Sequence, residues 1–448
     1  MTLEGALEKR TLSSCFYSIF AFIAIFVMVA NDATDDVSDN IVLSIAASTS
    51  ALSLMALNLF LSIRLRVSEK VFGGLDKQYF FHKFNGYSIV VFVFLHWFLG
   101  AKSRTGEFIT GEQAKIGHWL GMVSFYLFLF LIIITIAKRL PKYIGKFLVI
   151  YNKDFVTYEK WRLMHKLMGV VFILVACHHS LVNPQLGVPF PETKTFWYVF
   201  YVSLFGTTSY LVSLCQGLFG HKKYIVTESK FLSTNVKKIK FAPTVRNNQL
   251  IKSGQFSFIS FPEYTELNEP HPFTLSGVER DGSLSVIVKN KGNFTQQFVS
   301  NVKIGDIVNV SAPHGSFHFT SGKSNNQIWI AASIGITPFI SWCSDICRRE
   351  DLNVYLIHSV NRSEKETYLE ELEEIKIKCA NVRVIQHLTD GTDGKRLGID
   401  MIRRYCGGDL RSTDLFFCGP KSMKSSLLRD MRKLNRPMSF NTEHFEFR

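Results

Sequence analysis

The chain has 448 residues, of which 47% are hydrophobic and only 20% are charged, and it contains 40 phenylalanines. A purely soluble enzyme seldom has this composition, and a length of about 150 residues per domain allows about three domains. The net charge of +14 does not indicate nucleic-acid binding, because the surplus Lys and Arg lie mostly in short loops between apolar runs and along the junction at 221–240. We therefore expect a chain that is half membrane-embedded and half soluble.

Six uncharged segments precede residue 221, and each could cross a bilayer, which takes about 20 helical residues. They occupy residues 11–30, 41–63, 84–100, 116–137, 167–191 and 195–220. Because no small-residue cleavage site follows the first segment, we interpret it as a retained span and not as a signal peptide. Residues 1–220 are thus predicted to form a six-helix transmembrane bundle in a bacterial inner membrane or a plasma membrane.

The orientation of the bundle follows from the loops. Basic residues are concentrated before the first segment and in the loops after the second and fourth, which places these loops and both termini in the cytoplasm. The outer loop 101–115 disagrees, because it carries Lys102, Arg104 and Lys115. These three cations could attract an anionic acceptor.

Two of the predicted spans carry histidines at matching spacing. His82 and His96 are 14 residues apart on the third span and its cytoplasmic entrance. On an α-helix this spacing leaves the two side chains within about 40° of one face and about 21 Å apart along the axis. His165 lies on the fifth span with the adjacent pair His178 and His179. Because histidine inside a membrane is costly and usually functional, we expect the two helices to hold two b-type haems between them, each with one imidazole from each helix.

The outer ligand on the fifth span is ambiguous. His179 lies 14 residues after His165 and shares its face, whereas His178, at 13 residues, points about 140° away unless a π-bulge intervenes. Straight-helix geometry therefore favours His179. His118, at the outer end of the fourth span, has no partner at this spacing, so we expect it at the membrane interface and not as a ligand.

The sequence beyond residue 220 has two patterns. Short alternating strands at 224–232, 236–243 and 254–261 predict an antiparallel β-barrel over residues 221–322. Over residues 323–448, strands alternate with helical sequence, which predicts an α/β doubly wound parallel sheet with its ligand at the carboxyl ends of the strands. The predicted strands of this sheet lie at 327–333, 353–360, 381–388 and 414–418, and the predicted helices at 333–350 and 365–379.

Two local features of this half bear on its chemistry. The turn Gly335–Thr337 opens a helix, whose free N–H groups could receive a phosphate. The eight cysteines are scattered without a C-x-x-C pair, so we predict neither a disulfide framework nor a zinc site.

Five short motifs of the soluble half occur in one order along the chain. They are His271-Pro272-Phe273-Thr274-Leu275, Gly292-x-x-Thr295, Pro313-His314-Gly315, Gly335-Ile336-Thr337-Pro338-Phe339 and Phe417-Cys418-Gly419-Pro420. Together they resemble the ferredoxin-reductase-type flavoprotein module. Joined to spans with paired histidines, the whole chain resembles the ferric reductase and NADPH oxidase superfamily of transmembrane b-type cytochromes.

The resemblance implies roles for individual residues. His271, Pro272, Phe273 and Thr274 would lie along the isoalloxazine and ribityl chain of FAD, and Lys289, Gly292 and Thr295 would contact its pyrophosphate. Gly335, Thr337 and Pro338 would receive the pyridine nucleotide, and Cys418, Gly419 and Pro420 would place nicotinamide against the flavin. Ser359 and Arg362 would read a 2′-phosphate, which favours NADPH over NADH. Phe445 and Phe447 are both candidates for an aromatic side chain that covers the flavin.

The resemblance also bears on the haem ligands and the function. It matches His82 and His96 to the inner and outer ligands of the oxidases, whose fifth-span spacing selects His178 and contradicts the geometric choice of His179, so both stay open. The implied enzyme passes electrons from cytoplasmic NADPH through FAD and two haems to an external acceptor, O₂ or a ferric chelate. Two alternatives remain: a relay subunit that feeds an external partner protein, and a haem-free protein whose histidines transport protons or metal ions. The oligomeric state is not predicted.

Overall fold

The structure is a computed structural model that describes residues 3–33, 37–103, 112–137, 158–182, 193–245, 251–390, 396–407, 410, 412–433 and 439–442. The chain divides into two compact units. One is helical and ends at Phe219, and the other contains Gly220–Arg448 together with two short earlier segments.

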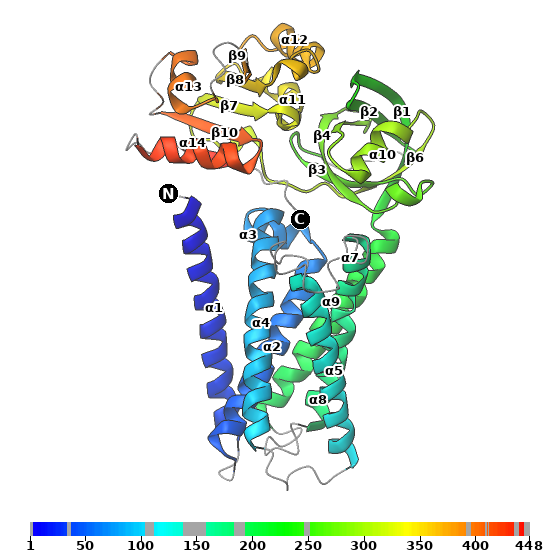
Figure 1. Ribbon diagram of the computed structural model, residues 1–448, viewed down its shortest axis with the longest axis vertical. Helices are drawn as coiled ribbons and strands as arrows, with labels where there is room; N and C mark the ends of the chain where they lie inside the picture. The colour runs from blue at the N-terminus through cyan, green and yellow to red at the C-terminus, as the bar shows by residue number, and fades with distance from the viewer. Residues whose placement is uncertain are drawn as a thin grey trace. The chain divides into compact units, whose positions relative to one another are not determined.

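The helices before residue 220 follow the predicted apolar segments (Figure 1). They are α1 (Leu3–Asp32), α2 (Asp39–Ser62), α3 (Arg66–Phe72), α4 (Leu75–Ser103), α5 (Glu112–Ala137), α7 (Tyr158–Lys166), α8 (Met168–Val182) and α9 (Lys194–Phe219). Among the described residues, four stretches are long and apolar enough to span a membrane: Asp39–Ser62, Lys115–Ile136, Lys160–Val182 and Lys194–Gln216. The first predicted span has a shorter apolar stretch, Tyr17–Asp32, and the third is covered by the more polar α4. The prediction of a helical membrane domain is thus confirmed, whereas the count of six spans is not.

Glycines allow α8 and α9 to approach each other closely. A Cβ atom at Gly169 of α8 would lie 2.2 Å from the Tyr210 ring of α9, and a Cβ at Gly206 of α9 would lie 2.2 Å from the Phe172 ring of α8. Small residues at helix contacts are typical of membrane bundles, where packing drives helix association. The two reciprocal contacts fix α8, the helix that carries His178 and His179, against its neighbour.

The fifth predicted span is not one straight helix. α7 ends at Lys166 and α8 begins at Met168, and the Leu167 N–H donates to Met164 O, three residues back. A three-residue repeat turns the chain faster than the 3.6-residue repeat of an α-helix. The angle between His165 and the later histidines therefore cannot be calculated at 100° per residue, which removes the premise that favoured His179.

Six antiparallel strands form a closed barrel, as predicted. They are β1 (His221–Ser233), β2 (Val236–Pro243), β3 (Phe256–Ser260), β4 (His271–Val278), β5 (Leu284–Lys289) and β6 (Ile307–Ser311), in the spatial order β1-β2-β5-β4-β3-β6. The barrel closes where β1 pairs with β6. A short helix, α10 (Asn293–Asn301), joins β5 to β6 and contributes Phe294 and Phe298 to the barrel core.

A parallel five-stranded sheet follows, in the order β11-β10-β7-β8-β9. Its strands are β7 (Asn326–Ala332), β8 (Asn353–Val360), β9 (Val382–Leu388), β10 (Thr413–Cys418) and β11 (Ser439–Thr442), and its helices are α11 (Thr337–Ile346), α12 (Leu369–Lys378), α13 (Ile399–Tyr405) and α14 (Lys421–Lys433). Successive residues of β7 point to opposite faces: Trp329 packs in one core with α11 and α12, and Ile328 in another with α13 and α14. The predicted doubly wound sheet is therefore confirmed.

One covalent link was not expected from the sequence. Cys347, just after α11, forms a disulfide with Cys379, just after α12. The two residues are 32 positions apart and belong to no recognisable spacing pattern. The link exists because both helices pack on the same face of the sheet and end side by side, which no local motif reveals.

Candidate functional site

The helical unit brings the predicted histidines together in two groups. His82 of α4 lies opposite His165 of α7, with ring centroids 6.3 Å apart. Fourteen residues further along α4, the ring of His96 lies 6.3 Å from that of His178 and 6.3 Å from that of His179. The spacing on the continuous helix α4 thus matches two groups of imidazoles at two levels of the bundle.

The separation within each group fits a bound metal. An ion that two imidazole nitrogens bind at about 2 Å each requires ring centroids about 6 Å apart on opposite sides of it. Among the described residues, no group of three or more His, Cys, Asp or Glu side chains is arranged to hold a metal ion directly. Paired imidazoles without further protein ligands suit a metal whose other ligands come from a macrocycle, as in a b-type haem.

Backbone carbonyls orient two of these rings. His96 Nδ1 lies 3.0 Å from Ser44 O of α2, and His178 Nδ1 lies 2.7 Å from Gly117 O of α5. A carbonyl oxygen can only accept, so a neutral ring that bonds to it through Nδ1 carries the proton there and has its lone pair on Nε2. The Ser44 hydroxyl also lies 2.9 Å from Nδ1 of His96. Metal-ligating histidines usually show this arrangement, in which the nitrogen away from the metal donates to a carbonyl.

Two glycines of α5 make room for His178. Gly117 and Gly121 form a G-x-x-x-G pair, and a Cβ at Gly121 would lie 2.7 Å from His178 Nδ1. A larger residue at position 121 would push this ring away from the Gly117 carbonyl. The helix contact between α5 and α8 therefore positions the imidazole as well as joining the helices.

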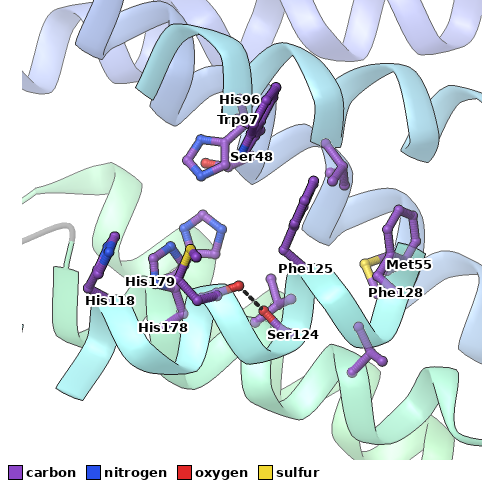
Figure 2. A pocket seen from close by; sticks show the side chains of 16 residues that line it. Ser48, Met55, His96, Trp97, His118, Ser124, Phe125, Phe128, His178 and His179 are labelled. Atoms are coloured by element: carbon purple, nitrogen blue, oxygen red, sulfur yellow. Dashed lines mark hydrogen bonds between the residues drawn. The ribbon is translucent and has the colours of Figure 1, made fainter. Parts of the chain in front are cut away.

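A pocket lies between α2, α4, α5 and α8 at the level of His96. Figure 2 shows His96 and Trp97 on one wall and His118, His178 and His179 on the other. The space between these helices, counted out to its open mouth and including open solvent, is about 730 Å³. His118, which we expected at the interface and not as a ligand, lines this pocket too.

Space is also left at the level of His82. Gly86 follows His82 by one turn of α4, and a Cβ there would meet no atom within 4 Å. His165 on the opposite side stacks on Trp161, with ring centroids 5.3 Å apart. These observations leave open space beside Gly86, one turn from His82, at this level of the bundle.

In the second unit, two turns meet at the carboxyl ends of β7 and β10. Gly335 lies so close to the other turn that a Cβ would stand 2.3 Å from Cys418 O, and a Cβ at Gly419 would stand 2.8 Å from the Ala332 side chain. The chain runs outward in opposite directions from β7 to β8 and from β10 to β11, so the gap between β7 and β10 is the switch point where such sheets bind ligands. The structure thus brings together the two predicted nucleotide-binding segments, with Thr337 and Pro338 in the first turn of α11.

The predicted flavin segment forms β4 and faces α10. His271 at the start of β4 stacks on Phe294 of α10, with ring centroids 3.7 Å apart, and Phe273 contacts the same helix. At the start of α10, Thr295 Oγ1 accepts from the Gly292 N–H, and a Cβ on Gly292 would meet nothing within 4 Å. A helix N-terminus beside open space suits a phosphate group. Pro272 and Thr274 lie within β4.

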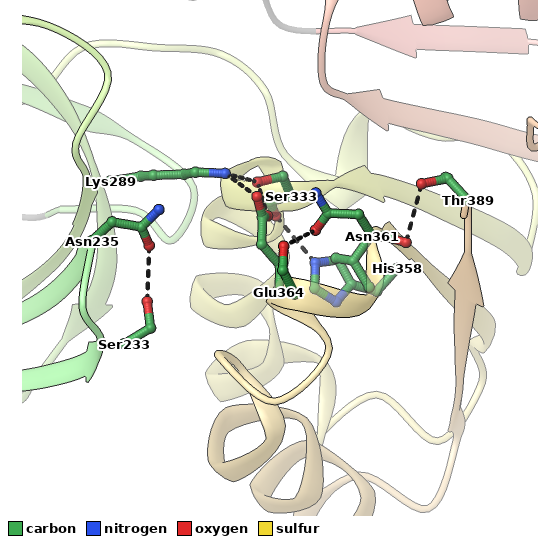
Figure 3. A network of polar contacts seen from close by, with 10 residues as sticks. Ser233, Asn235, Lys289, Ser333, His358, Asn361, Glu364 and Thr389 are labelled. Atoms are coloured by element: carbon green, nitrogen blue, oxygen red, sulfur yellow. Dashed lines mark hydrogen bonds and ion pairs between the residues drawn. The ribbon is translucent and has the colours of Figure 1, made fainter. Parts of the chain in front are cut away.

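The side chain of Lys289, expected at the FAD pyrophosphate, contacts the turn after β7. Its Nζ donates to Ser333 Oγ at 2.9 Å and pairs with Glu364, so this side chain joins the barrel to the turn after β7 (Figure 3). Ser359 is buried at the end of β8, and the exposed Arg362 donates its N–H to Asp390 Oδ1. Beside them, burial lowers the pKa of His358 to about 4. Phe445 and Phe447 lie outside the described residues, as does Arg104.

Several residues at these sites were not found from the sequence. Ser44 and Gly117 act through main-chain oxygens, and Ser333 and Glu364 meet Lys289 only after the barrel and the sheet have come together. No motif or periodicity marks such contacts. The G-x-x-x-G pair on α5 is the one signal in the sequence that could have indicated a close helix contact beside His178.

Three sequence families match successive parts of the chain. The family described as "Ferric reductase like transmembrane component" matches residues 47–176, "FAD-binding domain" matches 221–329, and "Oxidoreductase NAD-binding domain" matches 329–428. The three matches occur in the order of the helical unit, the barrel and the parallel sheet.

Similar proteins include Flavohemoprotein A of Dictyostelium discoideum, 24% identical over 200 residues that cover 41% of this chain and 49% of that protein. The Flavohemoprotein of Candida albicans is 25% identical over 228 residues, which cover 48% of this chain and 56% of that protein. This chain thus spans about half the length of these curated relatives.

Among solved structures, a flavohemoglobin from Malassezia yamatoensis with bound FAD and heme aligns at a TM-score of 0.47 and 15% identity, covering 91% of this chain and 99% of that chain. A ferredoxin NADP+ reductase from Neisseria gonorrhoeae aligns at a TM-score of 0.43 and 18% identity, covering 50% and 98%.

The order of the three family matches agrees with the order of motifs in the sequence and with the observed fold. A transmembrane component of this kind, followed by FAD- and NAD-binding modules, makes the protein an oxidoreductase. The chain belongs to the ferric reductase and NADPH oxidase superfamily, in which a ferric-reductase-like transmembrane domain is fused to a ferredoxin-reductase-type module.

Proposed function

We propose that the chain takes electrons from NADPH and passes them, through FAD and two b-type haems, to a one-electron acceptor on the far side of a bilayer. The acceptor would be O₂, which gives superoxide, or a ferric chelate, which gives ferrous iron. The family matches supply the transmembrane, FAD-binding and NAD-binding parts. The haems, the electron-transfer route and the identity of the acceptor belong to the proposal.

The observation that supports the haems is the repeated imidazole separation. His82 with His165, and His96 with its partner on α8, both have ring centroids 6.3 Å apart. Along α4 the two levels are about 21 Å apart at about 1.5 Å per residue. A single pair of facing histidines in apolar helices could be a coincidence. Two pairs with the same ring separation, between α4 and the successive helices α7 and α8, favour one kind of ligand at both levels.

For the outer haem we propose His96 and His178. The Nδ1–H of each ring donates to a backbone carbonyl, which leaves Nε2 aimed for coordination. His179 has the same ring separation from His96, so distance alone does not choose between them. The hydrogen bond to the Gly117 carbonyl supports His178, and His179 would then line the edge of the site.

When bound, FAD accepts two electrons as a hydride and haem carries one electron at a time, so the two groups together would convert a hydride donor into single-electron transfer. The residues of the chain bind and orient. The start of α10 at Gly292 would hold the FAD pyrophosphate, and the turn Gly335–Pro338 would hold the nucleotide phosphates. Cys418, Gly419 and Pro420, packed against that turn, would place the nicotinamide ring.

The acceptor would meet the outer pocket without displacing a ligand. Two imidazoles for each haem leave no ligand position open, so reduction would take place at the edge of the pocket. His118 and Trp97 line the pocket from opposite sides (Figure 2). Phe125 and Phe128 make the interior apolar, which suits O₂ entering the pocket and a charged chelate remaining at its mouth.

We propose NADPH as the donor because Arg362 is exposed just after β8, where a 2′-phosphate would be read. We also propose six spans with both termini in the cytoplasm. The long helices α1 and α4 cover the first and third predicted spans, which are less apolar than the other four. The basic loops agree with a cytoplasmic location of both termini.

The test is one preparation of the full chain in detergent with added FAD. A dithionite-reduced spectrum with a b-type Soret band and two haems per chain is expected, together with NADPH oxidation that depends on an acceptor. Cytochrome c reduction under air that superoxide dismutase suppresses would identify O₂ as the acceptor. Anaerobic reduction of a ferric chelate would identify iron. Haem reduction without turnover on either acceptor would support the relay subunit, and a chain without haem would refute the proposal.

A further inference from the structure

The barrel and the nucleotide-binding sheet are joined by a carboxylate that takes two donors. Glu364 pairs with Lys289 Nζ and accepts from Ser333 Oγ at 2.5 Å, while Lys289 Nζ also donates to Ser333 Oγ at 2.9 Å (Figure 3). The lysine and glutamate side chains are only 13% and 15% exposed. The three groups therefore form a closed set in which a negative charge lies between a cation and a hydroxyl.

The position of these three groups, at the turn before α11, is more informative than the strength of their interactions. Ser333 is the first residue of the turn Ser333–Ile336, which leads directly into α11. Its φ of +51° is unusual for a residue with a side chain, and such strain is typically retained at functional sites. This turn is the segment to which the proposed function assigns the phosphates of the pyridine nucleotide.

A carboxylate and a phosphate group bind the same kinds of hydrogen-bond donors. Both accept charge-assisted hydrogen bonds from an ammonium group and from hydroxyl or amide donors at a turn. Resting on the proposed function of that turn, we propose that Glu364 is an internal competitor of the nucleotide, whose carboxylate occupies Lys289 and Ser333 until a phosphate of the pyridine nucleotide displaces it.

Because both groups are negatively charged, Glu364 and a phosphate do not occupy the site together. Burial raises the pKa of Glu364, but hydrogen bonds from Lys289 and Ser333 outweigh it and hold the pKa below its ordinary value. The group is thus anionic at neutral pH, and two anions do not share one lysine at low cost. Glu364 belongs to a single short turn, Arg362–Glu364, with both neighbouring residues exposed, so it can move into solvent without unfolding a strand.

Competition by Glu364 would affect nucleotide affinity in the direction opposite to a simple interdomain contact. If the ion pair only held the two domains together, removing its acid would loosen the site and weaken nucleotide binding or leave it unchanged. If Glu364 competes, the nucleotide can bind only to molecules in which Glu364 has left the site. The apparent affinity of the unmodified protein is then lower than its intrinsic affinity. Removing the charge then tightens binding.

The test measures NADP⁺ binding by calorimetry to the FAD-loaded full chain in detergent, without turnover. Glu364→Gln is expected to lower the Kd about tenfold, the size of one charge-assisted hydrogen bond. Glu364→Asp, whose shorter side chain keeps the charge but loses reach, is expected to tighten binding less. The matched control Glu366→Gln removes the same charge from an exposed residue two positions away and should leave the Kd within about twofold.

An unchanged or weaker affinity in folded Glu364→Gln and Glu364→Asp, judged by tryptophan emission, would overturn the inference while leaving the proposed function intact. If the unmodified chain bound neither NADP⁺ nor NADH, the assignment of the turn to a pyridine nucleotide would fail first, and the competitor with it. Tighter binding in Glu366→Gln as well would show a general charge effect and would also overturn the inference.

Discussion

His358 makes the stability of the nucleotide-binding domain depend on pH. It lies on β8 with none of its surface exposed, and its Nε2–H donates to Ser333 O at 3.1 Å. Burial lowers its pKa from 6.5 to about 4, although the Ser333 bond and the charge of Glu364 oppose the shift. The folded protein therefore binds fewer protons than the unfolded chain between these two values.

The sign and size follow from that difference. The contribution of neutral His358 is complete above a pH of about 6.5 and is lost as the pH falls from there toward about 4, because protons then bind the unfolded chain first. Between about pH 7.5 and about pH 5, a pKa shift of this size lowers the free energy of unfolding by about 2 kcal/mol. His358→Gln keeps a donor for Ser333 O but does not titrate, so this part of the pH dependence should disappear.

Urea unfolding of the full chain in detergent, followed by tryptophan emission, measures the effect at both pH values. Trp329 and Trp342 are buried in the same domain and report on its unfolding. Comparing the pH dependence of His358→Gln with that of the unmodified chain cancels all other titrating groups. His387→Gln, on the neighbouring strand β9, is the matched control for loss of a buried imidazole. Equal pH dependence in the unmodified chain and His358→Gln would refute the reasoning.

Three further experiments test the sites. His178→Ala should reduce the haem content from two to one per chain, whereas His179→Ala should retain both; the reverse result would return the ligand to the straight-helix choice. Gly335→Ala introduces a Cβ 2.3 Å from the backbone of the opposite turn, so the Kd for NADP⁺ should rise at least about tenfold with an unchanged haem spectrum; unaltered binding would contradict the close approach. Lys237→Met removes the buried cation that donates to two carbonyls at the end of α10. Leaving them unsatisfied should cost about 2 kcal/mol and weaken FAD binding measured by flavin fluorescence, and an equal effect of Lys240→Met on the same strand would show that the cap is not responsible.

The sequence predicted most of the fold because its signals are local. Alternation of apolar residues placed the barrel strands, and β–α alternation placed the parallel sheet with its turn at Gly335. Apolar length identified the helices, but α4 carries the polar residues of a binding site, so its composition is less apolar than that of a simple span. A helix with several polar side chains gives a weaker sequence signal of a membrane span.

The candidate site was less predictable because its contacts are not local. The break at Leu167 changes the angle between His165 and His178 and depends on packing that periodicity does not encode. The partners of His96 and Lys289 lie on other elements, 52 and 44 residues away for Ser44 and Ser333. Residue types at matching spacing identified the histidines, but their orientation required the three-dimensional structure.

The carbonyls that orient His96 and His178 have an evolutionary consequence. Every residue brings a main-chain oxygen, so a point mutation at position 117 cannot delete the acceptor of His178, and its cost falls on packing instead. At position 117 that cost is specific, since a Cβ would lie 2.7 Å from the Val182 side chain. At position 44 the side chain is constrained as well, because the buried Ser44 hydroxyl lies 2.9 Å from His96 Nδ1. Both rings are sensitive to any insertion or deletion in α2 or α5. Alignments of such proteins should show a small residue at position 117, a small hydroxyl residue at position 44 and a constant helix length around both.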